Sequence, residues 1–364
     1  MAGSSVIRAF QVALCLLLGA AAITPVCAAE STDLIRVETG GSSGSTVRLG
    51  EDIASLVDDG TTRRLMPVIG RGGVQNLADL LEGRIADLAF LQLDVLDYAR
   101  TQKLFPDLET RISYIAKLNY VEFHLLARPE VVNIADLAGQ IVNFGPASGD
   151  TSITAAQLFR MLKISPIPGN DEPGLAIEKL RRGEIGAVAF VGGKPAPLLR
   201  AADTSGLHLV PVPLTPDVAA TYVPSKLNAT DYPGLVSHDA PVDTVAVATG
   251  LFVGPVTAGS DDYRKLANVV DTFFTQFQTL LAPGHHGKWA DVNLSTQIPG
   301  LQRFTPAEEW LKRNAAVAAG QDLRMIFMKF LDERAKTTGG QMMSPEQKDA
   351  LFDQFRHWQS GQSN

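Results

Sequence analysis

The sequence predicts an α/β protein built from two similar lobes, with helices added at the C-terminal end. Strand-like and helix-like hydrophobic patterns alternate from residue 34 to about residue 190, which is typical of a mostly parallel sheet with helices on its faces. The order strand, Gly/Ser-rich loop and helix occurs near residue 40 and again near residue 145. This repetition is the observation that predicts two lobes.

The first 29 residues predict a cleavable secretory signal peptide. Arg8 supplies a positive charge, residues 12–23 form an apolar run without a charged residue, and small residues follow. The apolar run is shorter than the roughly 20 residues that a membrane-spanning helix needs. We expect cleavage after Ala28 or Ala29 and export to the periplasm, with a retained membrane anchor as the alternative.

The composition excludes several classes of site. Both cysteines, Cys15 and Cys27, lie inside the predicted signal peptide, so the exported chain is expected to have no disulfide, thiolate metal site or cysteine nucleophile. The net charge of −7 argues against a nucleic-acid partner, which usually requires a basic face. With 364 residues and 45% hydrophobic content, the chain can bury one or two ordinary cores.

The first lobe begins with two strand–turn–helix units and a buried strand. The expected elements are a strand at 34–37, a Gly/Ser loop at 40–45, an amphipathic helix carrying Val47, Ile53, Leu56 and Val57, a strand at 65–69, a glycine-rich turn at 70–73, a helix at 74–81 closed by Gly83, and a strand at 86–91. The last strand is apolar except for Asp87, as expected for a strand covered on both faces.

The second lobe repeats this organisation. The expected elements are a strand at 141–144, a loop at 145–150, a helix at 151–162, a helix at 176–182 and a buried strand at 185–191. We expect the chain to cross between lobes near residues 128–133 and to return between 214 and 239, after which come a strand at 245–253 and an amphipathic helix at 263–281. Lobe 1 is therefore predicted to comprise residues 30–130 and 240–304, and lobe 2 residues 131–239.

Residues 305–364 are predicted to form a C-terminal helical extension. Thr305 is expected to cap a helix that has Pro306 at its first position, with Glu308 three residues after the cap. The segment beginning at Ser344 repeats this pattern, and residues 337–341 are expected to form a flexible joint. An apolar helix face lies between the two starts.

The two Gly/Ser loops are the candidate binding elements. Each joins a strand end to a helix start, where free backbone N–H groups and the helix dipole favour an anion. Ser43 and Thr46 in the first loop, and Ser148 and Thr151 in the second, add hydroxyl groups. Either loop alone is equally consistent with an ordinary helix cap, but two of them at the carboxyl ends of parallel strands indicate a ligand cleft.

Two further polar positions have open interpretations. Gln92 and Asp94 follow a buried strand, so their side chains either face the cleft or cap the next helix. Arg71 lies beside a helix start, where a guanidinium would clamp a carboxylate, although a solvated loop arginine fits the sequence equally.

No motif of an enzyme or cofactor site is present. The Gly70–Gly73 turn lacks the spacing of a dinucleotide fingerprint, and the sequence contains no phosphate-binding loop, Gly-x-Ser-x-Gly elbow or His-Glu-x-x-His helix. His285 and His286 lie between glycines and are expected to form a solvated loop. We therefore expect no cofactor, no metal site and no catalytic activity.

Several segments together resemble the TAXI subgroup of solute receptors for tripartite ATP-independent periplasmic (TRAP) transporters. The similar segments are the loop and helix at 40–50, in which Val47 replaces the usual aromatic, Ile69–Leu77 with Asn76, Ala86–Asp94, Asp136–Gly145 with Ser148 and Gly149, and Ala229–Gly234. They occur in the family's order and cover roughly residues 33–300.

This resemblance implies a type II periplasmic-binding-protein-like fold, with two lobes joined by a hinge that close over a small carboxylate or amino acid. It implies a TRAP-type membrane permease as the partner. From these segments and the two loops we predict ligand contacts at Ser43, Thr46, Asn76, Gln92, Ser148 and Thr151, with Arg71, which departs from the family pattern, as a charge partner. A ligand-sensing co-receptor for a membrane signalling protein and an exported enzyme on the same fold are the alternatives.

Overall fold

The computed structural model describes residues 33–41, 44–83, 85–338 and 343–361. The predicted signal peptide lies outside the described residues. Within the described ranges, no helix is both long and apolar enough to cross a bilayer.

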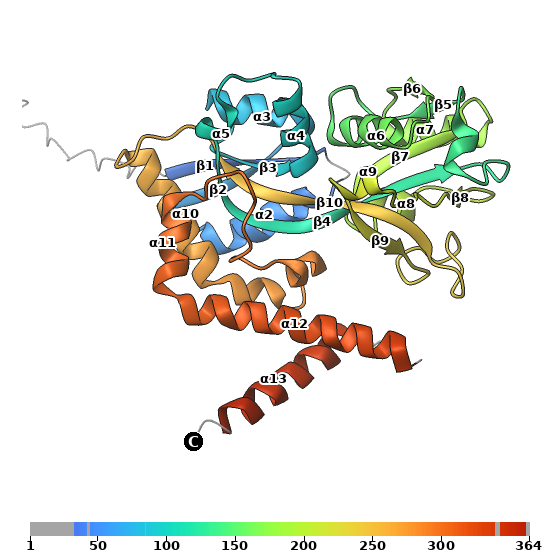
Figure 1. Ribbon diagram of the computed structural model, residues 1–364. Coiled ribbons are helices and arrows are strands. Elements are labelled where there is room, and N and C mark those ends of the chain that lie inside the picture. The colour runs from blue at the N-terminus through green and yellow to red at the C-terminus, as the bar shows by residue number, and fades with distance from the viewer. Residues whose placement is uncertain (1–32, 42–43, 84, 339–342, 362–364) are drawn as a thin grey trace, which may run out of the picture. The chain divides into compact units, whose positions relative to one another are not determined.

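Ten strands form one mixed sheet (Figure 1). The strands are β1 (Asp33–Thr39), β2 (Arg63–Ile69), β3 (Leu88–Gln92), β4 (Ser113–Ala127), β5 (Ile141–Asn143), β6 (Ile167–Gly169), β7 (Ala187–Gly192), β8 (His208–Leu209), β9 (Val223–Leu227) and β10 (Val242–Val253).

Helices follow most of the strands. The α-helices are α2 (Ser45–Val57), α3 (Gly73–Glu82), α4 (Leu93–Thr101), α5 (Leu108–Arg111), α6 (Asp150–Met161), α7 (Pro173–Arg181), α8 (Pro197–Ala201), α9 (Pro216–Ala219), α10 (Asp261–Thr275), α11 (Thr305–Arg313), α12 (Ala315–Thr338) and α13 (Pro345–Gly361). The 3-10 helices are η1 (Ile134–Leu137), η2 (Phe277–Leu281) and η3 (Gly287–Asp291).

The strand order is the same in the two halves of the sheet. The main path runs β2-β1-β3-β10-β4-β7-β5-β6. In each half, three parallel strands lie in the order second, first, third, and a long antiparallel strand flanks the third: β10 beside β3, and β4 beside β7. We call β1–β3 with their helices the first half, and β5–β7 with theirs the second half.

This arrangement confirms the predicted fold class, an α/β fold of the type II periplasmic-binding-protein kind with a C-terminal helical extension. The sheet is mixed rather than mostly parallel, because β4 and β10 pair antiparallel with each other and with their neighbours. The assignment of residue ranges to two lobes stays a prediction.

The two long strands connect the halves. β4 pairs with β10 from Ser113 to Glu122 and with β7 from Glu122 to Ala127. The chain thus passes along the sheet within β4 itself, ahead of the crossing that the sequence predicts near residues 128–133. The sequence pattern did not reveal β4, because the buried polar residues Asn119, Glu122 and His124 interrupt its apolar run.

Each half of the sheet is covered on both faces by apolar side chains. In the first half, α2 and α10 pack on one face and α3 and α4 on the other. In the second half, α6 covers one face, and α7 and α8 cover the other. Helix α10 shows why hydrophobic periodicity could predict a helix. Its residues at helical spacing are all buried, namely Leu266, Val270, Phe273 and Phe274. It is shorter than predicted, since η2 takes over after Thr275.

The C-terminal extension is helical, as predicted. The second start has the reciprocal cap: the Ser344 hydroxyl accepts the N–H of Gln347, and the Gln347 side chain accepts the N–H of Ser344. The first start differs, since Phe304, not Thr305, occupies the cap position of α11. Phe327 of α12 stacks on Phe355 of α13, with ring centroids 4.9 Å apart.

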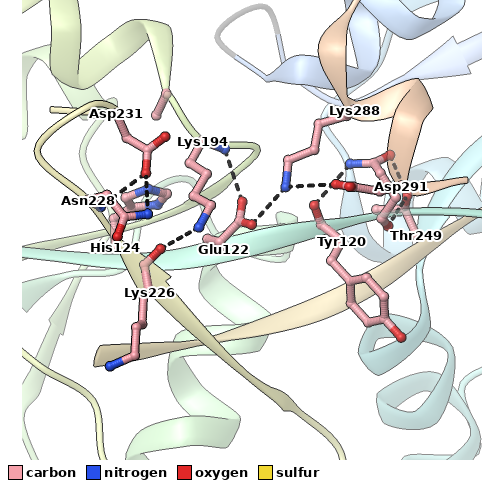
Figure 2. Close-up of polar contacts among 12 residues, drawn as sticks. Tyr120, Glu122, His124, Lys194, Lys226, Asn228, Asp231, Thr249, Lys288 and Asp291 are labelled. Carbon is pink, nitrogen blue, oxygen red and sulfur yellow. Dashed lines mark hydrogen bonds and ion pairs between the residues drawn. The ribbon is translucent and has the colours of Figure 1, made fainter. Parts of the chain in front are cut away.

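A buried ion pair joins η3 to the middle of the sheet (Figure 2). Lys288 Nζ lies 2.8 Å from Glu122 Oε1 on β4, and the backbone N–H of Lys194 donates to the other carboxylate oxygen at 3.0 Å. Only 2% of Glu122 is exposed. Burial raises the pKa of Glu122, while the charges of Lys288 and Lys194 oppose that shift.

We predict that Lys288→Met destabilises the protein by about 3–5 kcal/mol, because it leaves the Glu122 carboxylate buried without its cation. Urea denaturation at pH 7 measures this free energy of unfolding. The double variant Lys288→Met with Glu122→Gln should recover part of the loss. Arg182→Met, which removes an exposed pair with Glu184, is the control and should change little. A Lys288→Met protein as stable as the parent would contradict the prediction.

Candidate functional site

A cavity of about 680 Å³ lies where the helix starts of the two halves meet. Its lining includes the ends of β1 and β3, the starts of α2, α6 and α7, and the turn before α3. The lining residues that the argument uses are Ser45, Thr46, Arg71, Gln92, Asp150 and Thr151. A cavity of this size fits a small organic molecule.

The first wall is the loop between β1 and α2. Gly40, Gly41 and Gly44 bring backbone to the cavity surface, and the Thr46 hydroxyl accepts the Gly40 N–H at 2.8 Å. Among the residues that the structure describes, no side chain caps the start of α2. The Ser45 hydroxyl oxygen is buried and has no hydrogen-bond partner among the described residues, although the residue lines the cavity. A bound oxygen group would satisfy it.

The second wall is the turn before α3. Gly70 and Arg71 line the cavity, and the arginine side chain is exposed to it. Asn76 lies one turn into the helix and is fully buried. Its carbonyl oxygen accepts the Gly72 N–H at 2.8 Å, and its amide donates to the Thr39 carbonyl at 2.7 Å. Asn76 therefore ties two loops of the first half together.

The third wall belongs to the second half. The loop from Gly145 to Gly149 precedes α6, and Thr151 follows in its first turn. The Thr151 hydroxyl accepts the N–H of Val191 at 3.1 Å, which fastens the helix start to the end of β7. Ser148 has a positive φ of 64°, and its carbonyl oxygen accepts the Val74 N–H at 3.3 Å.

The structure brings four of the seven predicted contacts together around this cavity: Thr46, Arg71, Gln92 and Thr151. Asn76 and Ser148 are not in its lining. Both instead make hydrogen bonds that hold the surrounding loops. Ser43 lies outside the described residues. As ligand contacts, all seven stay predictions.

Asp150 and Glu172 line the same cavity and were missed. An acidic residue in the first turn of a helix is so common that the sequence gives no special signal for it. The Asp150 Oδ1 atom accepts the Gly73 N–H at 2.7 Å. Burial raises the pKa of Asp150 to about 7, the Gly73 hydrogen bond opposes the shift, and the nearby Asp94 adds to it.

The segment that forms the cavity matches the profile of one sequence family. Residues 37–268 match the profile described as the NMT1-like family, from β1 into α10. The chain belongs to the NMT1-like family. The match includes all residues of the cavity lining, whereas α11–α13 lie beyond it.

Solved structures are similar to this NMT1-like protein over most of its length. A protein described as a periplasmic transporter is 13% identical, with a TM-score of 0.46 over 79% of this chain and 93% of its own. The periplasmic aliphatic sulphonate binding protein SsuA from Escherichia coli is 14% identical, with a TM-score of 0.39 over 88% and 83%. The substrate binding protein of an amino acid ABC transporter is 9% identical, with a TM-score of 0.41 over 71% and 96%.

A buried polar network lies behind the cavity of the NMT1-like protein. Asp94 is fully buried in α4, and its Oδ2 atom accepts the hydroxyls of Thr154 at 2.6 Å and Tyr222 at 3.0 Å. Thr154 also donates to the side-chain oxygen of Gln92 at 3.3 Å. Burial raises the pKa of Asp94 to about 6, although both hydroxyls oppose the shift. Of the two roles left open by the sequence, Gln92 lines the cavity and does not cap α4, whereas Asp94 takes neither role and bonds Thr154 and Tyr222 instead.

His285 and His286 do not form the solvated loop that the sequence predicts. Asp52, buried in α2, accepts the N–H of His286 and the indole N–H of Trp289, both at 2.8 Å, and lies 3.1 Å from Nδ1 of His285. The carboxylate therefore anchors this segment to the first half. The described residues contain no group of three or more His, Cys, Asp or Glu side chains placed to hold a metal ion.

Another carboxyl with a raised pKa, that of Glu38, lies next to the turn before α3. Glu38 at the end of β1 is 2% exposed, and its Oε2 atom has no hydrogen-bond partner among the described residues. Burial, together with a smaller contribution from the neighbouring carboxyl of Asp79, raises the pKa of Glu38 to about 7. The folded protein therefore holds a proton here that the unfolded chain releases above pH ~4.5.

We predict that Glu38→Gln flattens the pH dependence of stability between pH 5 and 8. Because the folded pKa lies above the unfolded one, Glu38 contributes stability at low pH that is lost as pH rises through about 7. The contribution of Glu38 to the free energy of unfolding should fall by about 3 kcal/mol over this rise in pH. Thermal unfolding at a series of pH values measures it, with Glu82→Gln on the exposed end of α3 as control. Parallel pH curves for Glu38→Gln and the parent would show that the buried carboxyl does not titrate in this range.

Proposed function

We propose that this protein is an exported solute receptor that binds a small carboxylate-bearing molecule in the cavity between its two halves. The observation that carries the proposal is the convergence of helix starts on that cavity. The starts of α2, α6 and α7 and the turn before α3 line it, and among the described residues none of these four helices is capped by the side chain of its own N-cap residue.

The charge of the lining favours an anion near α2. Helix N-termini carry partial positive charge and free N–H groups, and three glycines of the first loop allow close approach of a ligand oxygen. Arg71 adds a guanidinium suited to a carboxylate. Asp150 and Glu172 on the opposite wall disfavour a second negative group there, so the ligand is expected to present one carboxylate.

Closure follows from how the halves are connected. We infer that residues 30–130 with 240–304, and residues 131–239, move as two lobes about the middle of β4 and β10. A ligand that contacts both walls binds the closed form more tightly and shifts the population toward it. The membrane partner would recognise the closed form.

We infer that the partner is a TRAP-type permease and that the protein acts in the periplasm. The order of the TAXI-like segments supports the first inference, and the signal-peptide pattern of residues 1–29 supports the second. We propose that the cavity binds the solute without catalysing a reaction. The proposed ligand contacts are Thr46, Arg71, Gln92 and Thr151, together with Ser45 and Ser43 of the first loop.

A ligand-sensing co-receptor is the second candidate, and the C-terminal helices favour it. α12 presents Ile326, 65% exposed, and Phe330, 55% exposed, at adjacent helical turns. These helices lie beyond the region that matches the family, so they are suited to a partner specific to this protein. Copurification with a membrane histidine kinase, in place of a permease, would support sensing.

We predict that a small carboxylate stabilises the protein in a thermal-shift screen of carboxylates, amino acids and neutral sugars. Ligand at about 100 times its dissociation constant should add about 2.7 kcal/mol. A shift with neutral sugars alone would contradict the anion site, and no shift with any compound would contradict the receptor.

We further predict that Arg71→Ala weakens binding of that carboxylate by roughly 10–100-fold, the size expected for one charge-assisted hydrogen bond. Isothermal titration calorimetry measures the dissociation constant. Arg200→Ala on the exposed surface of α8 is the matched control and should leave it unchanged. Equal affinities for the two variants would remove Arg71 from the site.

A further inference from the structure

The second half touches the start of α3 through two hydrogen bonds. Oδ1 of Asp150 accepts the N–H of Gly73 at 2.7 Å, and the Ser148 carbonyl accepts the N–H of Val74 at 3.3 Å. These are the first N–H groups of a helix that has no side-chain cap of its own. A carboxylate from the other half thus serves as the cap of α3.

The two glycines at this helix start leave room for the contact. A methyl group on Gly72 would collide with the Asp150 carboxylate, and one on Gly73 would collide with the Ser148 carbonyl oxygen. Both glycines also have positive φ, 75° and 60°. Gly83 at the other end of α3 has a similar φ of 65°, but a methyl group there would meet nothing within 4 Å. The helix start is therefore shaped to receive the second half.

Ser148 shows that the second half is shaped for the same contact. Its φ of 64° is uncommon for a residue other than glycine. This conformation accompanies the carbonyl contact with Val74 and places Asp150 two residues further on. Nearby, Asp94 of the first half bonds Thr154 and Tyr222 of the second, so the contact lies at the edge of a wider junction.

We propose that Asp150 is a positioning residue: its carboxyl docks the second half on the first turn of α3 and so holds the cleft closed over the cavity. The proposal rests on the proposed function, because it assumes that the halves open and close. It differs from ligand binding, since the contact joins protein to protein.

The surroundings of Asp150 make the docked state sensitive to pH. Asp94 of α4 raises its pKa, Glu172 at the start of α7 lines the same cavity, and Arg71 in the turn before α3 is the cation of that lining. The described residues of the β1–α2 loop present only glycine and hydroxyl groups there. Burial in the docked arrangement raises the pKa of Asp150 from its ordinary 3.8 to about 7, although the Gly73 hydrogen bond itself opposes that shift. The docked form therefore takes up a proton between these values, and docking weakens as pH rises through about 7. The protonated carboxyl still accepts the Gly73 N–H through its carbonyl oxygen.

Distance measurement by pulsed electron resonance tests the proposal without knowledge of the solute. The full chain carries Cys15→Ser and Cys27→Ser, which removes both native cysteines. Spin labels are placed on Glu82→Cys at the exposed end of α3 and Glu178→Cys on exposed α7. Four variants are compared with this parent: Asp150→Ala, Asp150→Asn, Gly73→Ala and the control Gly83→Ala.

We expect Asp150→Ala and Gly73→Ala to shift the distances toward longer separations, with the ratio of closed to open protein falling roughly tenfold for Asp150→Ala. Asp150→Asn keeps an acceptor and should stay closed, and Gly83→Ala should match the parent because it adds the same backbone strain without a collision. Raising the pH from 6 to 8 should open the parent more than Asp150→Asn, because the buried Asp94, whose pKa is about 6, titrates in both proteins.

Distances in Asp150→Ala and Gly73→Ala that match the parent would overturn the proposal. Opening in Gly83→Ala equal to that in Gly73→Ala would overturn it too, because strain in α3 and not the contact would then control closure. An equal pH response of Asp150→Asn would remove Asp150 as the titrating group. Failure of the solute screen with an intact response here would count against the proposed function alone.

Discussion

The antiparallel pairing of β4 with β10 is the constraint on which the rest of the structure depends. Each strand is long enough to belong to both halves, so each half acquires its fourth strand from a segment that also builds the other. Register between the halves is consequently set by backbone hydrogen bonds rather than by side chains alone. The cavity, the two sets of helix starts and the buried ion pair of Glu122 with Lys288 all lie beside this ladder.

Charged groups are buried in this region at a free-energy cost that the packing of the two halves must offset. Glu122 is matched by a cation, whereas no cation among the described residues pairs with Glu38, Asp94 or Asp150, and the pKa values of these three rise because burial disfavours the ionised form. Of these three, Asp94 and Asp150 each bond a residue of the opposite half. Perturbed carboxyls gathered at a junction around a cavity are typical of a functional region.

The periodic parts of the sequence predicted the fold well, and the interrupted parts did not. The α10 face of Leu266, Val270 and Phe273 repeats at helical spacing, so its helix could be located. β4 could not, because Asn119, Glu122 and His124 make a mostly buried strand look like a polar segment. The candidate site followed the same division: Thr46 and Thr151 were found from loop composition, whereas Asp150 resembles any acidic residue in a first helical turn. Asn76 was predicted as a ligand contact from its place in a family-like segment, and its role in joining two loops was not foreseen because it depends on a partner 37 residues away.

The sequence by itself determined the α/β class, the repeated strand–loop–helix order, the helical C-terminal extension and the two glycine-rich loops, because these depend on local periodicity and backbone freedom. Only the tertiary structure decided that β4 and β10 are shared, that three helix starts and the turn before α3 surround one cavity, and that Asp150 reaches Gly73 across the cleft. Those features depend on contacts between residues far apart in the chain, and the burial that alters the chemistry of the carboxyls exists only once both halves have folded together.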